Sequence, residues 1–132
     1  MTATAAPTLG LALAVALAGG LGAAARFVVD GAVRARTAHV LPLATVLVNV
    51  SGSLVIGLLD GAALWHDLGP IWLVVAATGF CGGYTTFSTA MIETVRLMQS
   101  DEWRWAVVNA LGTLVLCVAA ASAGVAVMWA TR

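Results

Sequence analysis

The sequence predicts an all-α integral membrane protein with four transmembrane helices, and its composition is the main reason. Of the 132 residues, 61% are hydrophobic and 9% are charged, whereas soluble domains carry about 25% charged residues. The mean hydropathy is +1.01. A helix needs about 20 apolar residues to cross a membrane. We therefore expect one domain, residues 1–132, with helices at about 8–29, 42–65, 71–98 and 103–129.

The first predicted helix, at about 8–29, is rich in glycine and ends near an arginine. No Lys or Arg precedes it, so we expect a retained helix rather than a cleaved secretory signal. Small residues let helices approach closely, which predicts a packed helix rather than one that faces lipid. Arg26 is either an interfacial anchor or a functional residue. The four glycines are Gly10, Gly19, Gly20 and Gly22.

The second and fourth predicted helices carry polar side chains in apolar surroundings. Asn49 lies a little over two turns into the helix at about 42–65, where its amide needs a hydrogen-bond partner. In the helix at about 103–129, Asn109, Thr113 and Cys117 recur every four residues and form one stripe. Such groups either bond to a neighbouring helix or line a pore, and the composition leaves both possibilities open.

The third predicted helix, at about 71–98, contains a run of glycines and hydroxyls, GFCGGYTTFST at 79–89. Glycine loosens a helix, and hydrocarbon supplies no partners for the backbone groups that are freed. We therefore predict two helical pieces joined by a break near Gly82–Thr85, buried in protein or lining a watery cavity. Glu93 and Arg96 follow at i,i+3 spacing, close enough to interact.

The polar residues favour the passage of an ion over catalysis. The sequence shows no nucleophile–base pair, carboxylate pair or metal cluster, so we expect no enzyme, and its formal net charge of zero gives no argument for nucleic acid. Neutral hydroxyl and amide donors can replace the hydration shell of a small ion, and the ring edge of Phe87 suits an anion. A helix break also frees carbonyls, which suit a cation such as Na⁺.

The arginines indicate one preferred orientation in the membrane. Four helices place both termini and the middle loop on one side, where only Arg132 lies. The positive-inside rule then places the other two loops in the cytoplasm and both termini outside. The arginines on the cytoplasmic side are Arg26, Arg34, Arg36, Arg96 and Arg104.

Three segments together resemble one family. The run GFCGGYTTFST at 79–89 resembles the signature of the CrcB/Fluc fluoride channels. Residues 19–27, GGLGAAARF, and residues 42–52, PLATVLVNVSG, resemble that family's first-helix and second-helix motifs. The match spans essentially the whole chain, in order, and the third-helix motif is the specific one.

The resemblance implies an antiparallel, dual-topology dimer with two pores in the bacterial plasma (inner) membrane. Such a channel exports F⁻ passively from the cytoplasm and relieves fluoride toxicity. It also implies a structural Na⁺ at the dimer interface, held by backbone carbonyls at the positions of Gly82 and Thr85. Arg26 matches an arginine near the vestibule, and Glu93 a glutamate near the pore. The implied fluoride-pore residues are Asn49, Thr86, Phe87, Ser88, Asn109 and Thr113.

Two positions depart from the family pattern. Ala90 stands where the family has a second phenylalanine, and Ala44 where it usually has glycine. Either another side chain fills the gap at Ala90, or this subunit works beside a different one that supplies the rings. The arginine bias supports the second possibility, because an antiparallel homodimer needs each chain to insert both ways. We therefore favour a heterodimer with a paralogue of opposite orientation, with a homodimer as the alternative.

Two other functions compete with a fluoride channel. A small four-helix multidrug or cation exporter would need a membrane-embedded carboxylate, and the first helix has none before Asp30. A non-conducting structural subunit would explain the glycines and Ala90, but not the whole TTFST segment at 85–89.

Overall fold

The computed structural model describes residues 8–132, and all of its regular elements are helical. It contains four helical runs long and apolar enough to cross a membrane, which confirms the prediction of an all-α chain with four such helices. The first two are α1 (Leu9–Arg34) and α2 (Leu43–Trp65). The third comprises α3 (Pro70–Leu73), η1 (Val74–Cys81), α4 (Gly82–Tyr84) and α5 (Phe87–Gln99). The fourth comprises α6 (Trp103–Val107), η2 (Val108–Gly112) and α7 (Thr113–Ala130).

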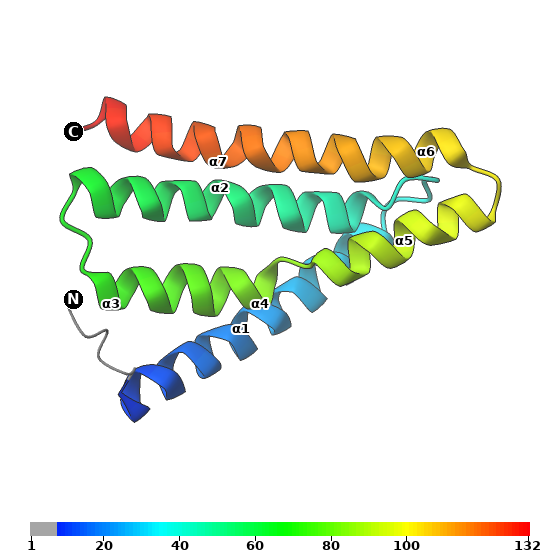
Figure 1. Ribbon diagram of the computed structural model, residues 1–132. Coiled ribbons are helices and arrows are strands. Elements are labelled where there is room, and N and C mark those ends of the chain that lie inside the picture. Colours follow the sequence, from blue (N-terminus) through cyan, green and yellow to red (C-terminus); the bar gives the residue numbers. More distant parts are fainter. Residues whose placement is uncertain (1–7) are drawn as a thin grey trace, which may run out of the picture.

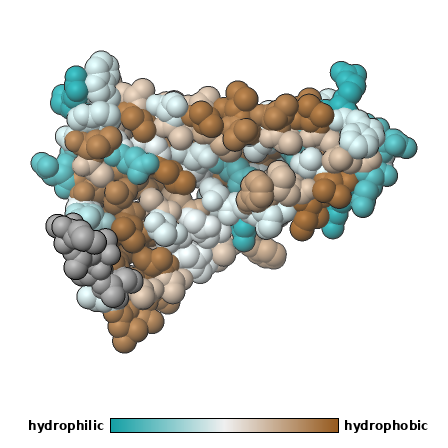
Figure 2. All heavy atoms as spheres, viewed as in Figure 1, coloured by the Kyte–Doolittle hydropathy of each residue, from teal (hydrophilic) through white to brown (hydrophobic). Residues whose placement is uncertain are grey.

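The four runs form an antiparallel bundle (Figure 1). The α1–α2 and α5–α6 connections lie at one end, and the α2–α3 connection and the C-terminus lie at the other. α2 packs most extensively on α7, while α1 crosses the bundle and packs on η1 and α4. Figure 2 shows hydrophilic residues mainly at the two ends and apolar atoms along much of the length between them. This arrangement suits a multi-pass membrane protein.

Glycines set how closely these helices approach. A Cβ at Gly57 of α2 would overlap the Ala121 carbonyl of α7, and a Cβ at Gly83 would overlap the Gly19 carbonyl of α1. Gly22 likewise lies against the Phe80 carbonyl. These close backbone contacts are the kind that small residues permit in membrane helices.

The prediction that the first helix is packed rather than lipid-facing is only partly right. Gly19 and Gly22 pack against η1 and α4, but Gly10 and Gly20 have open space around them. The outer face of α1 is exposed along its length, because its contacts are confined to the stripe that meets η1 and α4. The exposed leucines on it are Leu9, Leu13, Leu17 and Leu21.

The end of α1 differs most from the predicted boundaries. α1 runs to Arg34, five residues beyond the predicted end at 29, whereas the other boundaries differ by at most one residue. Arg34 pairs with Asp30 one turn earlier, with an Nε–Oδ2 distance of 2.7 Å. Such i,i+4 pairs stabilise a helix. The segment from 30 to 34, predicted as loop, is therefore the last turn of a helix that carries charge.

Candidate functional site

The backbone between α4 and α5 is not helical. Thr85 has φ −78° and ψ 161°, and Thr86 has φ −148° and ψ 121°, so both are extended. Gly82 and Gly83 remain helical and belong to α4. The helix is therefore interrupted at the two threonines rather than at the two glycines.

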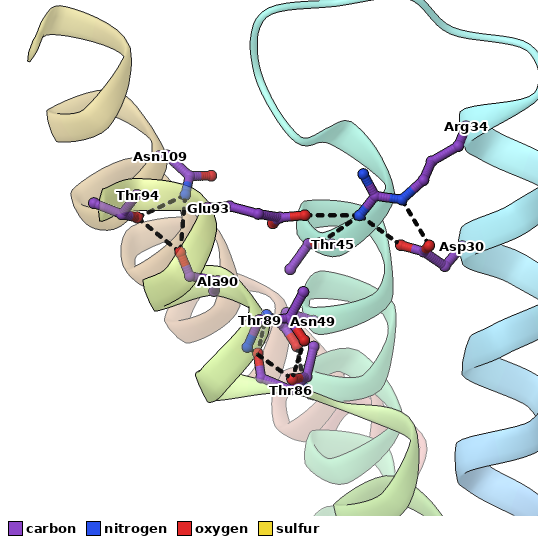
Figure 3. A network of polar contacts seen from close by, with 10 residues as sticks. All are labelled: Asp30, Arg34, Thr45, Asn49, Thr86, Thr89, Ala90, Glu93, Thr94 and Asn109. Atoms are coloured by element: carbon purple, nitrogen blue, oxygen red, sulfur yellow. Dashed lines mark hydrogen bonds and ion pairs between the residues drawn. The ribbon is translucent and has the colours of Figure 1, made fainter. Parts of the chain in front are cut away.

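Asn49 of α2 binds the backbone of Thr86 through both ends of its amide (Figure 3). Its Nδ2 donates to the Thr86 carbonyl at 2.8 Å, and its Oδ1 accepts from the Thr86 amide at 2.7 Å. Asn49 is 9% exposed. Unsatisfied backbone groups are costly where water is absent, so this paired contact stabilises the extended residue.

The Thr86 side chain begins the next helix. Its Oγ1 accepts from the Thr89 amide at 3.2 Å, as an N-cap does, and bonds to the Thr89 hydroxyl at 2.9 Å. In a continuous helix, the amides of Thr86 and Thr89 would bond the carbonyls of Gly82 and Thr85. Here the two amides donate instead to Asn49 Oδ1 and to Thr86 Oγ1. The carbonyls of Gly82 and Thr85, the predicted cation ligands, are therefore released from their usual helical partners.

Arg26 reaches one of these carbonyls. Its Nη1 donates to the Thr85 carbonyl oxygen at 3.3 Å, from α1 across to the interruption. A carbonyl oxygen has two lone pairs, so this contact leaves one of them free. Arg26 therefore lies at the interruption itself, and a cation bound there would share the Thr85 oxygen with it.

Most of the predicted pore residues meet at one cavity of about 270 Å³ between α2, α5, η2 and α7. Ser88 does not line it and is exposed on another face of α5. Ala90 lines it and is 7% exposed, whereas Phe87 is 78% exposed. The predicted pore residues that line it are Asn49, Thr86, Phe87, Asn109 and Thr113.

Hydrogen bonds within this cavity differ from one residue to the next. Asn109 is buried, and its Nδ2 donates to the Thr94 hydroxyl at 2.8 Å and to the Ala90 carbonyl at 3.4 Å (Figure 3). Thr113 Oγ1 is buried and has no hydrogen-bond partner among residues 8–132. Asn49 and Asn109 thus join helices and also line the cavity. Thr113 offers a hydroxyl that nothing in the described chain uses.

A second cavity of about 280 Å³ lies between α1, α2 and the start of α5. Thr86 lines both cavities, so the extended segment separates them. Arg26 and Arg34 line the second one, together with Asp30. The first cavity is lined by neutral residues, whereas the second has charges of both signs.

Glu93 pairs with Arg34 rather than with Arg96. The distance from Arg34 Nη2 to Glu93 Oε1 is 2.7 Å, and Arg34 also holds Asp30 (Figure 3). The predicted interaction with Arg96 does not form, because the Glu93 side chain points from α5 toward the end of α1. Sequence reasoning missed Arg34 as a site residue. Its i,i+4 spacing from Asp30 was the available signal.

We expect Asn49→Leu to lower the free energy of unfolding by about 3 kcal/mol, because it leaves the Thr86 amide and carbonyl unpaired. Unfolding in detergent by increasing dodecyl sulfate, followed by tryptophan fluorescence, measures the change. Ser53→Ala is the matched control, since Ser53 lies one turn away on α2 and lines the same cavity. An unfolding midpoint for Asn49→Leu equal to that of the control would contradict the role assigned to Asn49.

Comparison with known proteins points to one family. The family model described as CrcB-like protein, Camphor Resistance (CrcB), matches residues 13–125. A protein named Fluoride-specific ion channel FluC 1, from Leifsonia xyli subsp. xyli (strain CTCB07), is 51% identical over 112 residues, which cover 85% of this chain and 82% of the relative. Fluoride-specific ion channel FluC 2 from Mycolicibacterium paratuberculosis (strain ATCC BAA-968 / K-10) is 44% identical, with coverage of 89% and 93%.

A third relative, Fluoride-specific ion channel FluC 1 from Yersinia pestis, is 42% identical over 108 residues, which cover 81% of each chain. All three relatives are named as ion channels, which confirms the expectation of a protein that is not an enzyme. The four apolar helical runs and these relatives identify a multi-pass bacterial membrane protein. The chain belongs to the CrcB-like family.

Proposed function

We propose that this chain is a subunit of a fluoride-specific channel that exports F⁻ passively from the cytoplasm and so relieves fluoride toxicity. The observation that carries the proposal is the meeting of Asn49, Thr86 and Thr113 at one cavity beside the α4–α5 interruption. The names of the relatives support fluoride as the ion.

The chemistry of the first cavity suits a small anion. Thr113 brings a hydroxyl without a partner in the described chain, and Asn49 Nδ2 has a second hydrogen beyond the one that it donates to Thr86. Neutral donors can replace water around an ion without holding it as strongly as a full charge would. None of the described residues that line this cavity is charged, which favours a channel over a proton-coupled exporter.

We place the interruption near the middle of the membrane and assign the channel to an antiparallel dimer. Thr85 and Thr86 lie close to the centre of the run Pro70–Gln99, so the helical pieces on the two sides have similar lengths. Irregular backbone at that depth has to be covered by protein or line a cavity. The exposed ring of Phe87 beside the cavity is a surface that a second subunit would cover.

A structural Na⁺ at the dimer interface is the second part of the proposal. The carbonyls of Gly82 and Thr85 are released from helical bonding, and a second subunit with the same segment would bring four such oxygens together. Carbonyl oxygens at helix interruptions are suitable ligands for Na⁺. The guanidinium of Arg26 opposes a cation at Thr85, so the ion would have to use the free lone pair of that oxygen.

The heterodimer is the third part. Ala90 lines the first cavity at the position where the family resemblance implies a phenylalanine. A methyl group there leaves room beside Phe87 that a side chain from a different subunit could fill. The bias of the arginines toward one end supports a chain that inserts in one orientation.

Fluoride efflux from liposomes tests the function. The assembled channel is expected to release trapped F⁻ at a rate that does not depend on a pH gradient, and Thr113→Val is expected to slow that release about tenfold by removing one hydrogen-bond donor. Thr37→Val, in the connection after α1, is the control and should conduct as the wild type does. No flux from the wild-type assembly would favour a non-conducting subunit, and flux driven by a pH gradient would favour an exporter.

Removal of Na⁺ tests the cation site. Protein from which Na⁺ has been exchanged for N-methyl-D-glucamine, as verified by elemental analysis, is expected to lose most of its F⁻ flux. Millimolar Na⁺ should restore the flux, because carbonyls that face one another are stabilised by a cation between them. Undiminished flux in protein shown to be free of Na⁺ would rule out a structural role for this ion.

Reconstitution of the chain alone and with a CrcB paralogue tests the heterodimer. We expect dimers and F⁻ flux only when the two chains are purified together, because the arginine bias favours one orientation for this chain. If the chain alone, produced in a cell without any paralogue, forms a dimer that passes F⁻, the channel is a homodimer.

A further inference from the structure

We infer that Arg34 is a positioning residue for conduction, which holds the Glu93 carboxylate in an ion pair and cancels its charge beside the anion path. This inference rests on the proposed function, since it concerns the electrostatics of the route by which F⁻ would reach Thr86. Arg34 lies at the end of α1, outside the cavity where the predicted pore residues meet.

The geometry of the cluster shows one guanidinium shared by two carboxylates (Figure 3). Arg34 Nη2 bonds Glu93 Oε1 at 2.7 Å, and Arg34 also bonds both oxygens of Asp30, at 2.7 and 3.0 Å. α1 packs mainly on η1 and α4 rather than on α5. The long side chain of Arg34 therefore carries a positive charge from α1 across to a carboxylate on α5.

Glu93 lies on the face of α5 that meets the second cavity. It follows Thr89 at i+4, so these two side chains share one face of the helix, and Thr86 caps the start of that helix. Thr86 and Thr89 line that cavity together with Arg26 and Arg34. An anion that moves from the α1–α2 end of the bundle through this cavity to Thr86 passes close to Glu93.

The burial of the two carboxylates decides which of them would act more strongly on an anion nearby. The Glu93 side chain is 11% exposed and that of Asp30 is 32% exposed, so water screens Glu93 less. Glu93 Oε2 is buried and accepts no hydrogen bond from residues 8–132. Arg34 is thus the group that compensates this carboxylate, and a buried carboxylate without compensation is unfavourable.

The local charges balance only while Arg34 is present. Arg26 and Arg34 carry two positive charges, and Asp30 and Glu93 carry two negative ones. Removal of Arg34 leaves these groups with one net negative charge next to the anion path. Of the two carboxylates, that of Glu93 is the one that water screens less. A like charge at that place repels an incoming anion.

Fluoride efflux from the assembled channel tests this inference with three variants. Arg34→Met keeps the apolar stem and removes the charge, and it should slow the efflux about tenfold. Addition of Glu93→Gln to Arg34→Met should restore the rate to within about threefold of the wild type, because the uncompensated charge is gone. The control Arg36→Gln changes an exposed arginine whose one side-chain hydrogen bond within residues 8–132 is to the Ala32 carbonyl, and it should conduct normally.

Each outcome decides between this inference and the alternatives. If the wild-type assembly passes no F⁻, the proposed function fails; if it conducts and Arg34→Met conducts equally well, only the role of Arg34 fails. A double variant as slow as Arg34→Met would make Arg34 a structural tie between α1 and α5 and overturn the inference. If Arg34→Met does not fold, the double variant should fold and conduct, and its failure to fold would equally show a structural tie.

Discussion

The bidentate contact between Asn49 and the backbone of Thr86 is the interaction on which the rest of the site depends. It satisfies an amide and a carbonyl of the extended residue Thr86, which is buried. It also leaves the Thr86 hydroxyl free to cap α5. One amide side chain on α2 therefore fixes where α4 ends, where α5 begins and which carbonyls lose their helical partners.

Two cavities of different chemistry meet at this contact. The first, toward η2 and α7, is lined by neutral residues and includes the Thr113 hydroxyl, which has no hydrogen-bond partner among residues 8–132. The second, toward α1, carries guanidinium and carboxylate groups that balance one another around Arg34. Together they suit the proposed passage of a small anion, which is met by charges at one end and by neutral donors beyond Thr86.

The sequence was sufficient for the helical elements, because apolar length is a local signal, and five of the six predicted pore residues lie at the first cavity. It was not sufficient to identify which residues contact one another across the bundle. Asn49 binds a backbone group 37 residues away, which no spacing rule identifies. Gly83 marks close packing against α1 rather than a flexible point in the chain. Arg34 could have been placed on α1 from its i,i+4 relation to Asp30, but its reach to Glu93 depends on how α1 crosses the bundle.

The exchange rate of the Thr86 amide hydrogen with deuterium tests the central claim most directly. The amides of Phe87 and Ser88 begin α5 and have no partner within the helix, so they provide an internal reference at the same place in the chain. If Asn49 Oδ1 accepts from the Thr86 amide, this amide should exchange about 100-fold more slowly than those two. Equal exchange rates at Thr86, Phe87 and Ser88 would contradict the account.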